Sequence, residues 1–114
     1  MLLCEVASRL EAEELVRPED PEVEVPSAVA ADLLSDILAS RKEQFIILTG
    51  LISPQVIRTA EVVGALAVVL VRGKHPTQEM IGLARAHGIP LYTTMLPLFE
   101  SCVRLAPLVQ RVRA

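Results

Sequence analysis

Three apolar runs recur along the chain from residue 44 onward, and each ends abruptly at a polar or glycine turn. The runs are residues 44–49, 66–71 and 89–93, and their turns are Thr49-Gly50, Arg72-Gly73 and Thr93-Thr94. Residues 45–48 are apolar without alternation, which is typical of a strand covered on both faces. The repeat of about 22 residues leaves room for one helix after each strand, so the strands should pair in parallel through right-handed crossovers. We therefore predict an α/β fold of three layers, with a small, mostly parallel sheet of βα repeats and all three turns at one edge.

Proline, glycine and hydroxyl residues mark where the helices between these strands begin and end. A serine-proline pair is typical of an N-cap followed by the first helical residue, and glycine is typical of the position just past a helix. The predicted helix starts are Ser53-Pro54, Thr77 or His75, and Pro97, and the predicted ends are Gly64, Gly88 and Pro107.

The first 43 residues are less regular. Residues 3–10 have apolar side chains at helical spacing, and residues 11–16 fit either an extension of that helix or a short strand. Residues 23–25 alternate and are predicted as a short edge strand. Residues 28–40 are predicted as a helix, with Ser27 as its N-cap or Asp32 as the cap of a shorter helix. The apolar stripe of this helix would comprise Val29, Ala30, Leu33, Leu34, Ile37 and Leu38.

A chain of 114 residues is long enough for one hydrophobic core, so we predict a single domain. Residues 1–26 would form an N-terminal helix and edge region, residues 27–106 a helix plus three βα units, and residues 107–114 a C-terminal tail. The hydrophobic fraction of 52% is high for a small domain, which favours a homodimer that buries apolar surface against a second copy.

Charge and cysteine usage narrow the class of protein. Residues 1–36 carry a net charge of −8 and residues 37–114 a net charge of +5, a pattern that fits two mutually attracting parts of a domain or two subunits. Basic clusters interleaved with aromatic residues are missing, so no nucleic-acid partner is expected. Neither a membrane span nor a signal peptide is apparent, and Cys4 and Cys102 stand alone, so we expect a cytoplasmic protein.

The shared strand edge is the predicted ligand site. Hydroxyls, backbone N–H groups at helix starts and several cations suit a phosphate or another small anion. The predicted ligand-binding residues are Thr49, Gly50, Ser53, Arg72, Gly73, Lys74, His75, Thr93 and Thr94. In the alternative interpretation, the hydroxyl residues only cap helices and the cations are solvated loop charges.

No catalytic, metal or cofactor motif supports an enzyme. The phosphate-loop, dinucleotide, zinc-protease and nucleophile-elbow patterns are all missing from the sequence. Asp32 and Asp36 would share a helix face, but two carboxylates without a nearby histidine make a weak metal site. His87 precedes a helix-ending glycine, where a dipole role is expected, and Cys102 has no neighbouring histidine to activate it. We predict no catalytic residues, no metal and no cofactor.

Five segments, in this order, resemble a known family. They are Val6-Ala7 with Leu10, residues 32–38, Leu48-Thr49-Gly50, residues 67–73 with Pro76, and Leu83-Ala84 with residues 87–93. Together they resemble the DRTGG domain, a small prokaryotic module found alone, beside CBS domains, or next to phosphotransacetylase-like or pyrophosphatase domains. They are also similar to the N-terminal domain of HPr kinase/phosphorylase. The motif that names the family is not matched, because Asp20 is followed by no arginine, threonine or paired glycines. The resemblance implies a dimeric regulatory or ligand-sensing module without catalysis.

We therefore expect a non-catalytic regulatory module, homodimeric, that binds a small anionic ligand or a protein partner. The first alternative is a pure assembly domain, which predicts an exposed apolar helix face formed by Leu105, Leu108, Val109 and Val112. The second alternative is a small phosphate-handling enzyme, for which the sequence supplies no activated nucleophile.

Overall fold

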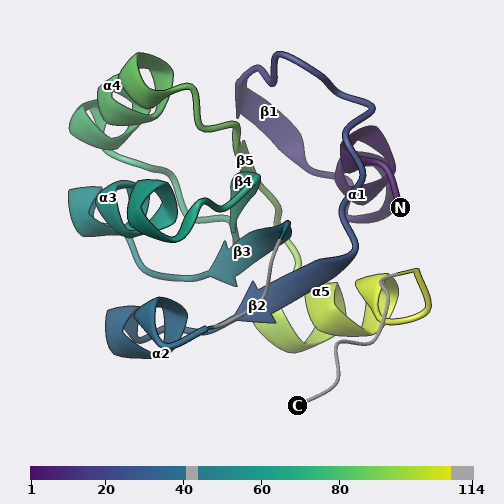
Figure 1. The fold of residues 1–114 in the computed structure, drawn as a ribbon. Coiled ribbons are helices and arrows are strands. Elements are labelled where there is room, and N and C mark those ends of the chain that lie inside the picture. The colour runs from purple at the N-terminus through teal and green to yellow at the C-terminus, as the bar shows by residue number, and fades with distance from the viewer. Residues whose placement is uncertain (41–43, 109–114) are drawn as a thin grey trace.

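The computed structural model describes residues 1–40 and 44–108, and it contains one five-stranded sheet (Figure 1). The strands are β1 (Glu13–Val16), β2 (Ser27–Ala30), β3 (Phe45–Thr49), β4 (Ala67–Leu70) and β5 (Leu91–Thr93). Their spatial order is β1-β5-β4-β3-β2. Strands β2, β3, β4 and β5 pair in parallel, and β1 pairs antiparallel with β5. The predicted small, mostly parallel sheet is confirmed.

Helices cover both faces of the sheet (Figure 1). They are α1 (Leu3–Arg9), α2 (Leu34–Leu38), α3 (Pro54–Val63), α4 (Gln78–His87) and α5 (Leu98–Leu105). Figure 1 shows α2, α3 and α4 stacked on one face, with α1 and α5 on the other. The three-layer prediction is therefore confirmed. Within the described residues, no helix is long and apolar enough to cross a membrane.

Strand β3 lies between two hydrophobic clusters, one on each face of the sheet. Phe45 and Ile47 belong to the cluster on the side of α2, α3 and α4, whereas Ile46 and Leu48 belong to the cluster on the side of α1 and α5. All five residues of β3 are buried. Because successive side chains of a strand point to opposite faces, both faces demand apolar residues, which explains the uninterrupted apolar run.

Local capping chemistry sets the bounds of the central helices as predicted. The Ser53 hydroxyl accepts a hydrogen bond of 3.2 Å from the Gln55 amide at the start of α3. Thr77, not His75, caps α4, because its hydroxyl accepts a 3.1 Å bond from the Met80 amide. Gly64 and Gly88 end these helices with φ of 70° and 66°, in the left-handed region that glycine adopts without strain.

The predicted helix at residues 28–40 is wrong in its first part. Residues 27–30 form the edge strand β2, which pairs in parallel with β3, and only the five-residue α2 follows. The alanine-rich sequence favours a helix locally, but pairing along the apolar β3 decides the outcome. Ile37 is buried, whereas Leu33 and Leu38 of the predicted stripe are 62% and 52% exposed. Neither Ser27 nor Asp32 caps α2, whose N-cap position is Leu33.

The remaining segments of the N-terminal region comprise a turn, a strand and an irregular stretch. The chain turns at Glu11, with φ of 51°, and residues 13–16 form the antiparallel strand β1. Residues 23–25, predicted as an edge strand, form only an isolated bridge between Leu2 and Glu24. The carbonyl of Val23 instead accepts a 2.9 Å bond from the Leu3 amide at the start of α1. Pro107 follows the end of α5, and residues 109–114 of the predicted tail at 107–114 lie outside the described residues.

Candidate ligand site at the carboxyl edge of the sheet

The four parallel strands end at one edge of the sheet, which brings the three predicted junctions together. Because β2, β3, β4 and β5 run in the same direction, the segments after Thr49, Leu70 and Thr93 all leave from this edge. The end of β2 adds a fourth junction that the sequence analysis did not anticipate. Open α/β sheets bind their ligands in this position.

At the first junction a carboxylate of the chain itself occupies the expected anion position. Asp32 Oδ1 accepts a 2.8 Å hydrogen bond from the Gly50 amide and a 3.3 Å bond from the Thr49 hydroxyl. The Thr49 hydroxyl also accepts a 3.2 Å bond from the Leu51 amide. Thr49 and Gly50 therefore bind an internal anion.

Sequence reasoning missed the role of Asp32 because the residue was placed inside a helix. It lies two positions after the end of β2, at the same edge as Thr49. Asp32 and Asp36 do not share a helix, since α2 begins only at Leu34. The paired-carboxylate face that the predicted helix implied is therefore wrong. Within the described residues, no group of three or more histidine, cysteine, aspartate or glutamate side chains is placed to hold a metal ion.

The second junction is a tight turn tied to the segment after β5. Arg72 and Gly73 have φ of 64° and 67°, and an ideal Cβ on Gly73 would lie 2.8 Å from the Met95 Sδ. The Arg72 amide donates a 2.8 Å bond to the Leu96 carbonyl, and the Gly73 amide a 2.8 Å bond to the Thr94 carbonyl. These two amides are thus engaged, while the side chains of Arg72, Lys74 and His75 are exposed.

The third junction uses its hydroxyls to bind neighbouring backbone. Thr93 donates a 2.7 Å bond to the Lys74 carbonyl. Thr94, which is 2% exposed, donates a 2.6 Å bond to the Leu10 carbonyl and accepts a 3.2 Å bond from the Leu96 amide. Both threonines hold the second and third junctions and the end of α1 in fixed positions.

A hollow of about 140 Å³, hereafter the edge hollow, lies between the second and third junctions. It is lined by Glu11, Glu13, Gly73, His75, Thr93, Thr94 and Met95. Four of these are predicted site residues, whereas Thr49, Gly50 and Ser53 are not part of its lining. The two glutamates were not predicted, because residues 11–16 fitted either a helix or a strand, and only the strand brings Glu13 beside β5.

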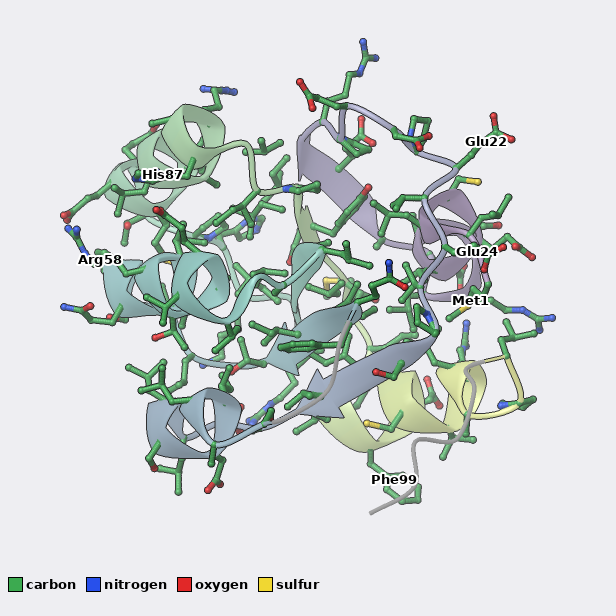
Figure 2. The ribbon with its side chains drawn as sticks, viewed as in Figure 1. Met1, Glu22, Glu24, Arg58, His87 and Phe99 are labelled. Atoms are coloured by element: carbon green, nitrogen blue, oxygen red, sulfur yellow. The ribbon has the colours of Figure 1, made fainter. Side chains whose placement is uncertain are left out.

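A larger hollow of about 750 Å³ opens at the opposite end of the sheet, between β1 and the end of α4. It is lined by Glu14, Leu15, Val16, Arg17, Glu19, Arg85, His87 and Gly88. Two of its basic groups already face carboxylates, with His87 Nδ1 2.8 Å from Glu61 Oε2 and Arg17 Nε 3.7 Å from Glu14 Oε2. His87 lies in the last turn of α4, at the outer side of the α3–α4 layer (Figure 2). Size alone favours this hollow, but two of its three basic groups already face carboxylates of the chain.

Burial raises the pKa values of two side chains, Tyr92 and Cys102. Burial, assisted by Glu14 and Cys4, raises the pKa of Tyr92 to about 12. Burial also raises the pKa of the Cys102 thiol. A neutral phenol and a neutral thiol are poor bases and nucleophiles near neutral pH.

Fold and edge together define a three-layer α/β domain whose parallel strands present one mixed-charge edge. A solved structure similar to it contains the CBS and DRTGG domains of the regulatory region of Clostridium perfringens pyrophosphatase, complexed with the activator diadenosine tetraphosphate. The TM-score is 0.73 at 19% identity, over 91% of this chain and 45% of that one. The present chain thus spans less than half of that structure, and the likeness supports a DRTGG-like fold. No family model and no curated protein matches the sequence.

Proposed function

We propose that this domain is a non-catalytic regulatory module that senses a small anionic ligand at the carboxyl edge of its sheet. The observation that carries the proposal is the cationic turn 72–75 beside the edge hollow. Among the described residues, neither Arg72 nor Lys74 forms an ion pair, and both side chains are exposed. The turn that carries them is fixed by backbone bonds to residues 94–96, so binding a ligand would order little additional chain.

The hydrogen bonds at this edge refine which residues would bind. Thr49, Gly50 and Ser53 are engaged with Asp32 and with the start of α3, so their part is to shape the edge. Arg72, Lys74 and His75 are the groups that can contact an anion directly. An edge hollow of about 140 Å³ is smaller than the 300–1,000 Å³ of typical small-molecule sites, so part of a larger ligand would remain on the rim.

The structural neighbour suggests which ligands to try first. Its regulatory region was solved with a nucleotide activator, diadenosine tetraphosphate. Nucleotides and polyphosphates are therefore the first ligands to test on this chain. A non-catalytic role accords with the protonated states of Tyr92 and Cys102 and with the engaged hydroxyls of Thr93 and Thr94.

A thermal-shift panel of inorganic pyrophosphate, AMP, ATP and diadenosine tetraphosphate tests the proposal. We expect at least one of them to raise the melting temperature by several degrees, because a ligand at a hundred times its Kd stabilises the native state by about 2.7 kcal/mol. The double variant R72A/K74A should weaken binding by about tenfold or more, since two cations are lost.

The matched control for this experiment is R17A/R85A, which removes two exposed cations from the opposite hollow. Its affinity should equal that of the wild type. Unchanged affinity of R72A/K74A, or no shift with any compound of the panel, would refute a ligand site at the carboxyl edge.

Part of the assembly surface expected from the sequence is wrong. Leu105 is 1% exposed and belongs to the core, Leu108 is half-buried, and Val109 and Val112 lie outside the described residues. The exposed apolar side chains of α5 are instead Phe99 and Val103, with exposures of 81% and 52%. They are four residues apart in the helix and therefore lie on one face, which we term the α5 outer face. Figure 2 shows Phe99 projecting from α5 away from the sheet.

We propose that a second copy of the chain binds to the α5 outer face. Strand β2 is the sheet edge on the same side of the molecule as α5, and its outer side has no strand partner within the described residues (Figure 1). In such a dimer the two β2 edges would pair antiparallel and the two α5 outer faces would be in contact. One two-fold axis can relate both contacts, so the assembly closes as a dimer.

Replacing Val103 with aspartate should therefore convert a dimer to a monomer in light scattering coupled to gel filtration, because a charge would be buried at the interface. The matched control is V62D, which places the same charge on an exposed valine of α3, on the other face of the sheet. A monomeric wild type, or a dimer that V62D disrupts as readily as V103D does, would rule out this dimer. A dimer that binds nothing from the ligand panel would favour a pure assembly domain.

A further inference from the structure

We infer that the edge hollow selects ligands that carry an amino group as well as a phosphate, with Glu13 accepting a hydrogen bond from that amino group. This inference rests on the proposed function, since it names the class of ligand for the same site. It concerns a residue that neither the predicted anion site nor the comparison assigns.

The position of Glu13 at the site follows from strand pairing. Glu13 is the first residue of β1 and lies directly opposite Thr93 of β5, at the edge where the parallel strands end. Glu13 lines the edge hollow together with Thr93 and His75. A carboxylate at this position is an acceptor only, so a phosphate placed against it would be repelled.

The second carboxylate of the hollow is compensated by a neighbour, whereas Glu13 is not. Arg104 Nη1 lies 3.0 Å from Glu11 Oε2, so the charge of Glu11 is matched within the chain. Among the described residues, Glu13 has no ion-pair partner. Glu13 therefore remains available as an acceptor for a donor group of a ligand.

The turn after β4 lies across β5 from Glu13 and carries two exposed cations, Arg72 and Lys74. His75 belongs to the lining of the hollow, and Arg72 and Lys74 precede His75 in the same tight turn. A ligand that spans the two sides needs a donor group toward Glu13 and an anion toward the turn. A single inorganic phosphate satisfies only the second requirement.

Size and shape further restrict the group that enters. A hollow of about 140 Å³ admits a fragment the size of a heterocyclic base and not a whole nucleotide. Met95 contributes a wall next to Gly73, and its exposed thioether can adjust to a planar ring. The surrounding backbone is held by the bonds of Thr93 and Thr94 to Lys74 and Leu10, so both sides are fixed in advance. An amino-bearing base of a nucleotide meets all of these requirements.

Isothermal titration of the full chain with AMP and with IMP tests the inference, because IMP has a carbonyl oxygen in place of the amino group of AMP and a proton on the adjacent ring nitrogen N1. The wild type should bind AMP about tenfold or more tightly than IMP, since the carbonyl would face Glu13 without a donor. Glu13→Gln should remove most of this preference, because an amide can donate to the carbonyl as well as accept from the amino group. The matched control is Glu14→Gln, an exposed acid one position along that lines the opposite hollow. It should leave the preference unchanged.

The outcomes separate this inference from the proposed function. Equal affinity of the wild type for AMP and IMP, or an AMP preference that survives Glu13→Gln, overturns the role of Glu13 while ligand binding at the edge stands. A preference that Glu14→Gln removes equally overturns it too. If IMP and all four compounds of the thermal-shift panel fail to bind the wild type, the proposed function itself fails together with this inference.

Discussion

Replacing Ile47 with alanine should lower the free energy of unfolding by about 3–4 kcal/mol, within the usual range for large-to-small core substitutions. Ile47 is fully buried in the middle of β3, which pairs with β2 on one side and β4 on the other. Its side chain packs into the cluster beneath α2, α3 and α4. Neighbouring strands on both sides limit collapse into the vacated space, so the cavity term adds to the lost burial. Urea denaturation followed by circular dichroism measures the effect.

The control for this measurement is Val62→Ala, which shortens an apolar side chain that is 76% exposed on α3. A surface change of this kind should alter stability by no more than about 0.5 kcal/mol. A cost below about 1 kcal/mol for Ile47→Ala would show that β3 is not the centre of the core.

The second large effect should follow from Thr94→Val, which removes a buried hydroxyl and keeps the side-chain shape. We expect a loss of about 2 kcal/mol, because the Leu10 carbonyl and the Leu96 amide each lose a partner away from water. Exchange of the Leu96 amide hydrogen should become faster as well. Denaturation and hydrogen exchange on the same variant measure both effects.

Thr94→Ser serves as the control because it retains the hydroxyl and loses only a methyl group. Its cost should be about 1 kcal/mol and its Leu96 exchange close to that of the wild type. If Val and Ser variants are equally stable, the bond from Thr94 to Leu10 does not fasten α1 to the site.

Periodic apolar runs and local capping residues allowed most of the fold to be predicted. Strand β3 is covered on both faces, so its position shows in the sequence without any knowledge of its partners. Ser53, Thr77 and the helix-ending glycines act through bonds to residues close by, so their roles are also visible locally. The parallel direction of the strands then followed from the length of the crossovers.

Strand β2 could not be predicted in the same way, because its conformation depends on a distant partner. Ser27 through Ala30 are compatible with a helix when taken alone, and their pairing with β3 is a tertiary effect. Because residues 28–40 were predicted as a helix, the contact between Asp32 and Gly50 was not predicted. Asp32 was thus expected on a helix surface, although it binds the first junction.

The sequence predicted which side chains lie at the carboxyl edge. It did not predict that several of them form hydrogen bonds within the protein. Sequence order shows which side chains reach the edge, but not which of them are already satisfied by the chain. Thr49, Thr93 and Thr94 were expected to face a ligand, and each hydroxyl bonds within the protein. Glu13 reaches the hollow only because β1 returns antiparallel beside β5, a pairing that no local pattern reveals.

The most direct test of a ligand site at the carboxyl edge is a titration of the ¹⁵N-labelled domain with AMP, followed by amide chemical shifts in NMR spectra. We expect the largest changes on Gly73, His75 and Met95, around the edge hollow. Changes centred on Val16, Arg85 and Gly88 would instead place the ligand in the larger hollow at the opposite edge. That result, or spectra that AMP and the other compounds of the thermal-shift panel all leave unchanged, would contradict a ligand site at the carboxyl edge.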